Sequence, residues 1–220
     1  MTEPPPPDTT VSVVVIDDHR LLAESIAAGL SSAGGIAVVG IATTGAEGLW
    51  LVRLRRPDVC LLDQRLPDAT GTDLVPALLD SSPNTHILLV TASDSDDVLR
   101  RALDVGCVGF LTKGVGVTTL VEAVRRAADG EIVLTANDLR RLIPVEHSPS
   151  LHLGNDLTPR EREVLALLGQ GKSTATISSE LFLSSSTVRN HVQSVLTKLG
   201  AHSKLQAVTI ALREGIVGSG

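Results

Sequence analysis

The 220-residue sequence predicts an α/β fold, in which a doubly wound five-stranded parallel sheet is followed by a smaller all-α domain. Three observations support this prediction. The chain exceeds the roughly 100 to 150 residues of a usual single domain, so two units of unequal size are expected. Five short apolar runs alternate with helix-like segments up to about residue 130. Beyond residue 156 only helical patterns occur.

The first ten residues contain a run of four prolines, so residues 1–10 are expected to form an extended, mobile tail. The apolar runs that follow are rich in Val, Ile and Leu and do not alternate with polar residues, which indicates strands covered on both faces. They lie at 11–16, 36–42, 59–62, 86–91 and 107–112. Helical spacing between them, as at 20–30, 46–54 and 118–128, predicts a doubly wound domain over 11–130.

Residues 131–154 contain two prolines, two histidines and scattered serines, which is typical of a linker between domains. A helix is expected within this linker at about 137–142. The second domain is expected over 155–216. It opens on Thr158-Pro159-Arg160-Glu161, in which Thr is the N-cap, Pro the first helical residue and Glu the third, the spacing of a capping box.

Three further helical segments follow in the second domain. The first helix ends at 169–172, a short helix spans about 174–181, and Ser184 caps a third that runs to about Leu199. A last helix is expected at about 203–213. On the third helix an apolar face should pack inward, and it consists of Val188, Val192, Val195 and Leu199. The opposite face consists of Ser186, Arg189, Asn190, Gln193 and Thr197.

This outward face is polar, short-chained and weakly basic, which fits a helix that enters the major groove of DNA. An ordinary amphipathic helix with a solvated face would look the same on this evidence. The net charge of -6 by itself argues against nucleic acid as a partner. However, residues 151–220 hold seven Lys/Arg and five Asp/Glu, a net +2, whereas residues 1–150 carry -8. One copy should therefore bind DNA weakly, and a homodimer on a two-fold site is expected.

Cys60 and Cys107 lie inside apolar runs and are expected to be buried in the core, with a disulfide or redox switch as the alternative. No apolar run approaches the roughly 18 residues of a membrane helix, and the N-terminus lacks a basic segment followed by an apolar one. A cytoplasmic protein without membrane contact is expected. The six histidines, His191 among them, lack metal-ligand spacing, so no zinc site is expected.

Polar residues follow the predicted strands where those strands end. Asp17 and Asp18 follow the first, Asp63 the third, Thr91 ends the fourth and Lys113 follows the fifth. The carboxyl ends of parallel strands share one edge of a sheet, where functional groups gather. Three carboxylates, a hydroxyl and a lysine there predict a site for Mg²⁺ and an anion, and a carboxylate that can form an aspartyl phosphate.

Each residue of this set has a plain structural interpretation when taken alone. The Asp pair could cap a helix, Thr91 could simply end a strand and Lys113 could be a solvated loop residue. Their joint occurrence at successive strand ends favours the phosphoacceptor hypothesis.

The segments VVVIDDHRLL, LLDQRLPDATG, LLVTASDSDD and GFLTKG resemble the receiver domain of two-component response regulators over about 11–130. The resemblance implies that Asp63 is the phosphoacceptor. It implies that Mg²⁺ is bound by Asp18, Asp63 and the backbone carbonyl of Arg65, while Asp17 assists through a water molecule. A sensor histidine kinase is then the expected phosphodonor.

The same resemblance assigns roles to three residues on the fourth and fifth strands. Thr91 and Lys113 would hold the phosphoryl group, while Thr91 and Phe110 would form the switch. Phe110 stands where the family often has Tyr, and Thr70 stands where it often has Asp or Asn. Pro67 and Gly71 are expected to set the shape of the loop after the third strand, with Gly71 adopting a backbone conformation that other residues resist.

Residues 157–208 resemble a LuxR-type helix-turn-helix, and its combination with a receiver is that of the NarL/FixJ class. By position, the resemblance implies sequence-specific DNA binding and transcription control through Ser186, Arg189, Asn190 and Gln193. The candidate contacts to the DNA backbone are Lys172, Lys198 and Lys204. Gln193 stands where some members have Lys, and Ser178 replaces a common Ala. The helix at about 203–213 matches the one that pairs subunits in this family.

Two other functions remain as alternatives. A phosphatase of the haloacid dehalogenase type also uses a nucleophilic Asp with Mg²⁺, but it needs a second Asp two residues later, where this chain has Arg65. A DNA-binding transcription factor that works without phosphorylation, with a receiver-like domain used only for dimerisation, is the second alternative. We expect a regulator and not an enzyme.

Overall fold

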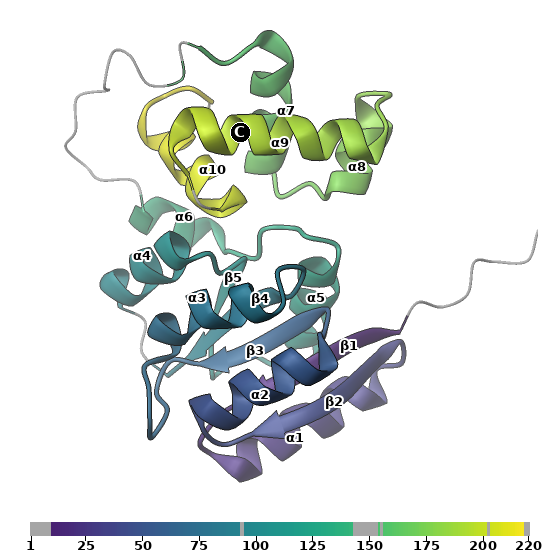
Figure 1. The fold of residues 1–220 in the computed structure, drawn as a ribbon, viewed down its shortest axis with the longest axis vertical. Coiled ribbons are helices and arrows are strands. Elements are labelled where there is room, and N and C mark those ends of the chain that lie inside the picture. Colours follow the sequence, from purple (N-terminus) through teal and green to yellow (C-terminus); the bar gives the residue numbers. More distant parts are fainter. Residues whose placement is uncertain (1–9, 93–94, 143–153, 155, 202, 218–220) are drawn as a thin grey trace, which may run out of the picture.

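A computed structural model of the chain describes residues 10–92, 95–142, 154, 156–201 and 203–217 (Figure 1). The first domain alternates strands and helices in the order β1 Val11–Ile16, α1 Arg20–Ser32, β2 Ile36–Ala42, α2 Gly45–Arg55, β3 Val59–Asp63, α3 Gly71–Ser81, β4 His86–Thr91, α4 Asp96–Val105, β5 Gly109–Thr112 and α5 Val117–Ala128. The helices that follow are α6 Ala136–Leu142, α7 Pro159–Gly169, α8 Thr174–Glu180, α9 Ser185–Leu199 and α10 Lys204–Arg213. The predicted combination of a doubly wound sheet and a smaller all-α domain is confirmed.

The five strands are parallel and lie in the order β2-β1-β3-β4-β5. Alternate residues of each strand point to opposite faces, and both faces are covered. Val13 and Val15 of β1 pack with α1 and α5, whereas Val14 and Ile16 pack with α2, α3 and α4. This two-sided burial explains why the strands have no alternating polar residues. The order of the strands reverses at β1 and β3, which places the carboxyl ends of these two strands at the usual ligand-binding position of such sheets.

Residues 131–142 are not a free linker, because they pack onto the first domain. Val133 forms a parallel bridge with Gly109, and its carbonyl accepts a hydrogen bond from the backbone N–H of Phe110 at 3.1 Å. The expected helix near 137–142 is present as α6, and Leu142 at its end is buried. The composition of residues 131–154 predicted a linker. In the structure the first half of this segment packs against the sheet and α4, because Ile132, Val133 and Leu142 are buried there. Residues 143–153, the rest of the predicted linker, and residues 1–9 of the predicted tail lie outside the described residues.

The second domain follows the sequence prediction closely. Thr158 and Glu161 form the capping box at the start of α7, and Ser184 caps α9 by accepting a hydrogen bond from the backbone N–H of Thr187. The predicted inward face of α9 is buried, with exposures of 0% for Val188, 6% for Val192, 0% for Val195 and 4% for Leu199. Both cysteines are buried free thiols, and burial raises the pKa of Cys107 to about 12. None of the helices in the described part of the chain combines the length and the apolar composition of a membrane span.

Glu161 connects α7 to α9 in the interior of the second domain. Its carboxylate accepts hydrogen bonds from Ser194 Oγ at 2.6 Å, Lys198 Nζ at 2.7 Å and the backbone N–H of Thr158 at 2.7 Å. Burial alone would raise the pKa of this carboxyl, but these hydrogen bonds outweigh it and lower the pKa to about 2. Because the folded pKa lies below the unfolded one, the stabilisation is complete above about pH 4.5 and is lost as the pH falls towards 2.

Replacement of Glu161 by Ala is expected to lower the free energy of unfolding of the second domain by about 2–3 kcal/mol, since it removes the carboxylate that accepts from Ser194 and Lys198 and leaves the Lys198 ammonium group only the carbonyl of Asp156 as an acceptor among the described residues. Urea unfolding at neutral pH, followed by far-ultraviolet circular dichroism, measures this loss. The control is Glu163→Ala, because Glu163 is 53% exposed and its ion-pair partner within the described part of the chain is Arg160 on the same helix. The control should change stability by less than about 0.5 kcal/mol, and equal losses in both variants would contradict the role of Glu161.

Candidate functional site

Three carboxylates meet at the carboxyl edge of β1 and β3. Asp17 and Asp18 directly follow β1, and Asp63 is the last residue of β3. The adjacent ends of the two strands, where Ile16 pairs with Leu62, bring these side chains together. Asp17 and Asp63 are buried, at 2% and 3% exposure, whereas Asp18 is exposed. The sequence prediction that these three residues converge is confirmed.

Lys113 lies between two of these carboxylates. Its Nζ is 2.8 Å from Oδ2 of Asp17 and 2.7 Å from Oδ2 of Asp63. The backbone N–H of Lys113 donates to the carbonyl of Thr91 at 2.8 Å, which joins the ends of β5 and β4. Burial raises the pKa of Asp63, although the hydrogen bonds from Lys113 and from the backbone N–H of Arg65 act in the opposite direction. Burial opposes the charge of Lys113 as well, but its two carboxylate partners raise the pKa of its ammonium group overall.

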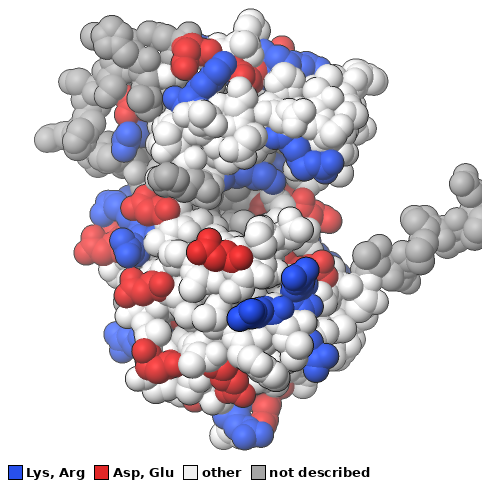
Figure 2. Space-filling view, viewed as in Figure 1, with Lys and Arg blue, Asp and Glu red and all other residues white. Residues whose placement is uncertain are grey.

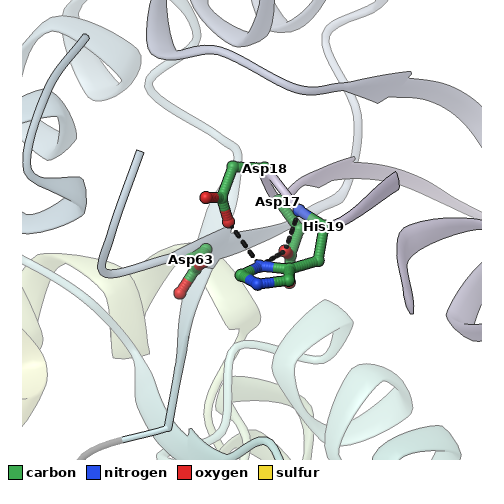
Figure 3. Close-up of side chains that lie close together, drawn as sticks. All are labelled: Asp17, Asp18, His19 and Asp63. Atoms are coloured by element: carbon green, nitrogen blue, oxygen red, sulfur yellow. Dashed lines mark hydrogen bonds and ion pairs between the residues drawn. The ribbon is translucent and has the colours of Figure 1, made fainter. Parts of the chain in front are cut away.

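His19 belongs to the same cluster and was missed by the sequence interpretation. Its Nδ1 lies 2.6 Å from Oδ1 of Asp18 and 3.4 Å from Oδ1 of Asp17, and its backbone N–H donates to Asp17 at 2.8 Å (Figure 3). His19 is also the N-cap residue of α1, so neither aspartate caps that helix through its side chain. Its position directly after the Asp pair was the available signal.

Two switch candidates lie on the neighbouring strands. Thr91 ends β4 and is 2% exposed, and Phe110 is the second residue of β5 and is 3% exposed. Phe110 packs in the core on the face of the sheet that α4 covers. The two residues therefore lie on either side of α4 in sequence, at the end of the strand before it and in the strand after it.

Gly71 shapes the loop after β3 for a reason that differs from the one expected. It is the first residue of α3 and is not among the residues with positive φ. A Cβ at Gly71 would lie 2.2 Å from the carbonyl oxygen of Asp63, so only glycine allows this close approach. The expectation of an unusual backbone conformation was wrong. Glycine is needed here because the chain folds back over Asp63. In this loop the N–H of Gly71 donates to the carbonyl of Gln64 at 2.9 Å.

The donor set of the cluster fits a hard divalent cation. Ligand atoms of Asp17, Asp18, His19 and Asp63 all lie within 4.8 Å of one another. Carboxylate oxygens are the ligands that Mg²⁺ prefers, and one ligand set commonly combines one or two of them with phosphate oxygens and waters. Lys113 already neutralises part of the charge of Asp17 and Asp63, so the remaining negative charge is concentrated towards Asp18.

The face of α9 predicted to contact DNA is exposed. Ser186, Arg189, Asn190 and Gln193 all lie on the solvent side of the helix, opposite the buried valines. Lys172 and Lys198 are placed differently, since Lys172 pairs with Glu180 at 2.9 Å and Lys198 with Glu161 at 2.7 Å. On the face drawn in Figure 2, charges of both signs are interspersed over the two domains. Phe182 lies in the turn between α8 and α9, and its side chain is 95% exposed.

A doubly wound sheet with an acidic edge, joined to a helix-turn-helix, defines the chain as a two-domain DNA-binding regulator. Comparison with known proteins agrees with this class. Residues 13–125 match the model of the response regulator receiver domain, and residues 155–211 match that of the bacterial regulatory proteins of the luxR family. The chain therefore belongs to the two-component response regulators with a receiver and a LuxR-type DNA-binding domain, a family of transcription regulators.

Individual relatives extend the match over most of the chain. The probable transcriptional regulatory protein NarL of Mycobacterium tuberculosis is 36% identical over 200 residues, which cover 91% of this chain and 93% of the relative. The crystal structure of ChrA, a response regulator of a heme-sensing two-component system, is 26% identical with a TM-score of 0.52, and the match covers 94% and 99% of the two chains. A structure of two RcsB dimers bound to two parallel DNAs matches at 22% identity and a TM-score of 0.55, over 93% and 98%, and shows the fold alone.

Proposed function

We propose that Asp63 accepts a phosphoryl group from a sensor histidine kinase and that this modification controls binding of the second domain to promoter DNA. The observation that supports this most strongly is the position of Lys113 Nζ, 2.7 Å from Asp63 and 2.8 Å from Asp17. A cation at this point can pair with the oxygens of a phosphoryl group on Asp63 as well as with the free carboxylate. The proposal assigns residues 11–130 to the receiver, 131–154 to the connection and 155–216 to the DNA-binding domain.

The chemistry assigned to Asp63 is nucleophilic. A carboxylate oxygen of Asp63 forms a bond to phosphorus as the bond between phosphorus and the phosphohistidine nitrogen of the kinase breaks, and that nitrogen keeps the electron pair. Lys113 then has phosphoryl oxygens to pair with, and the hydroxyl of Thr91 is assigned to the same group. Thr91 and Phe110 together are assigned the switch, because they flank α4 in the sequence.

Mg²⁺ is the proposed cofactor, with Asp18, Asp63 and the backbone carbonyl of Arg65 as ligands and Asp17 acting through water. When bound, Mg²⁺ would neutralise the charge on the phosphoryl oxygens. Without Mg²⁺, the carboxylates of Asp17 and Asp18 leave the site negatively charged. The proposal includes His19, which orients Asp18 through the 2.6 Å contact.

For DNA, we propose that Ser186, Arg189, Asn190 and Gln193 of α9 enter the major groove. Arg189 is the best candidate for a base or a nearby phosphate, since it carries the only charge in this set. Lys172 and Lys198 are assigned secondary contacts to the DNA backbone, because each already pairs with a carboxylate. Binding as a homodimer fits the net +2 of residues 151–220, and a cytoplasmic location fits a regulator that meets both a kinase and promoter DNA.

Selection from a pool of genomic DNA fragments tests this function. The wild-type protein, treated with a small-molecule phosphodonor and Mg²⁺, should retain discrete fragments with at least about tenfold higher affinity than the untreated protein. Removal of Mg²⁺ with a chelator before the phosphodonor is added should cancel the gain. Equal affinity in all three samples would favour the alternative, a transcription factor that binds DNA without phosphorylation and uses its receiver only for dimerisation.

A further inference from the structure

Helix α2 carries apolar side chains on two faces. Leu51 and Val52 are buried in the core, whereas Trp50 is 60% exposed and Leu54 is 56% exposed. Trp50 and Leu54 are four residues apart, so their side chains lie next to each other on the outer face of the helix. An exposed tryptophan is notable in this chain, because it is the only one and aromatic residues make up 1% of the sequence. The outer face of α2 therefore presents a large apolar surface to solvent.

Three basic side chains adjoin this apolar pair. Arg53, Arg55 and Arg56 lie at the end of α2 and are all exposed. Among the described residues, none of the three has a carboxylate as an ion-pair partner. We call Trp50 and Leu54 together with these three arginines the α2 patch. Its composition suits an apolar segment that also carries negative charge.

The start of β1 lies close to the end of α2. Ser12 donates to Oδ2 of Asp58 through its backbone N–H at 2.8 Å and through its Oγ at 2.7 Å. Asp58 comes three residues after Arg55, the last residue of α2. In Figure 1, α2 accordingly ends on the side of the sheet where β1 and β3 begin. Residues 1–9, which precede the described part of the chain, are therefore connected to the receiver beside the α2 patch.

The sequence of residues 1–9 matches the chemistry of the α2 patch. It contains the four prolines at 4–7 and two acidic residues, Glu3 and Asp8, and it has no Lys or Arg. Proline rings are apolar, and their fixed φ reduces the entropy lost when such a segment is ordered on an aromatic side chain. Because these prolines have no backbone N–H, they cannot donate the hydrogen bonds of a strand added at the edge of the sheet that β2 forms.

The segment is long enough for this contact. At about 3.1 Å per residue, the prolines at 4–7 reach roughly 12–22 Å beyond Val11. The end of α2 is within about 10 Å of Asp58, since it lies three residues away along the chain. Trp50 lies five residues before the end of α2, which is about 7.5 Å along the helix. The prolines can therefore reach Trp50 while Asp8 lies near the arginines.

We propose that residues 1–9 pack on the α2 patch, with the prolines at 4–7 against Trp50 and Leu54 and the acidic side chains next to the arginines. The contact forms within one chain, so the high effective concentration of the tethered segment compensates for its small area. A second copy is a less suitable occupant, because a two-fold contact through α2 would place the arginines of both copies opposite each other. The contact covers an apolar surface that would otherwise promote association, and it does not depend on phosphorylation of Asp63.

Trp50 reports on this contact directly. The chain has one Trp and no Tyr, so its tryptophan fluorescence comes from Trp50 alone. The test is quenching by acrylamide, which is uncharged, in the full chain and in a variant that combines Pro4→Ser, Pro5→Ser, Pro6→Ser and Pro7→Ser. The serine variant keeps the length and the charge of the segment. It should raise the quenching constant about twofold and shift the emission to longer wavelength, since the indole loses its proline cover.

The charges of the contact have a separate test. Asp8→Lys should also raise the quenching constant at low salt, because it replaces attraction to the arginines by repulsion. The difference from wild type should shrink at high salt, where exposed charges are screened. The matched control is Asp97→Lys, which makes the same charge change on α4 at a side chain that is 96% exposed. This control should be quenched as wild type is.

Equal quenching of wild type and the serine variant would overturn the proposal, and so would equal effects of the two lysine substitutions. Dilution of the wild type distinguishes the two occupants. Protection of Trp50 by a segment of its own chain does not change with protein concentration, and this result is expected. Protection that fades on dilution would assign the α2 patch to a second copy and contradict the proposal.

Discussion

Asp63→Ala is expected to abolish the gain in DNA affinity that a phosphodonor and Mg²⁺ produce in the wild type. The variant removes the carboxylate that lies 2.7 Å from Lys113 and is the only one of the three at the end of β3. Asp17 remains to pair with Lys113 at 2.8 Å, so the pocket keeps a neutralised lysine and the receiver should stay folded. Titration of labelled promoter fragments, monitored by fluorescence anisotropy, measures the gain before and after phosphodonor treatment.

The control for this substitution is Asp73→Ala. Asp73 is an aspartate of α3 whose side chain is 62% exposed and pairs with Arg101 at 3.3 Å, so its loss changes the net charge equally without affecting the pocket. The control should keep the full gain of at least about tenfold. If Asp63→Ala gained affinity as wild type does, phosphorylation of another residue or direct DNA binding would have to replace the mechanism.

Arg189→Ala is expected to weaken binding of the phosphorylated protein to its selected DNA by about 1–3 kcal/mol, or roughly 5- to 150-fold. Arg189 projects from the exposed face of α9, one position after the buried Val188, so its truncation should not disturb the core. Asn190→Ala should have a smaller effect of the same sign, because its amide carries no net charge. Competition titrations at one fixed salt concentration provide the comparison.

The control for Arg189 is Arg20→Ala in α1. Arg20 is 79% exposed, and among the residues that the structure describes its ion-pair partner is Glu24 on its own helix, so this variant removes one positive charge from the receiver instead of the DNA-binding domain. Its DNA affinity should stay within about twofold of wild type. A loss equal to that of Arg189→Ala would show that total charge and not the face of α9 governs binding.

Much of the fold could be predicted because local signals agree with the tertiary structure. Four apolar runs became strands with the predicted starts, and the fifth strand begins at Gly109, two residues after the predicted run. The start of α7 was predicted from four residues, since a capping box is a local interaction between positions three apart. The three carboxylates were predicted to meet because parallel strands end at a common edge. None of these inferences requires knowledge of a distant partner.

The features that the sequence did not predict depend on such distant partners. Lys198 turns inward to Glu161, 37 residues away, and Lys204 Nζ donates to the carbonyl of Gly130 in the first domain. The sequence alone did not distinguish these two lysines from Lys172 as candidate contacts to the DNA backbone. Residues 131–142 pack on the receiver through Val133. The composition of this segment indicated a linker and could not predict that contact. Gly71 could be recognised as special, but the reason, its approach to the carbonyl of Asp63, is a contact that only the folded loop creates.

The measurement that tests the central claim most directly is the mass spectrum of the intact protein after incubation with a small-molecule phosphodonor and Mg²⁺, recorded beside the Asp63→Asn variant. The account predicts one added phosphoryl group on the wild type, labile to hydroxylamine as an acyl phosphate is, and no adduct on the variant. An adduct of equal yield on Asp63→Asn, or no adduct on the wild type with any donor, would contradict the assignment of Asp63 as the phosphoacceptor.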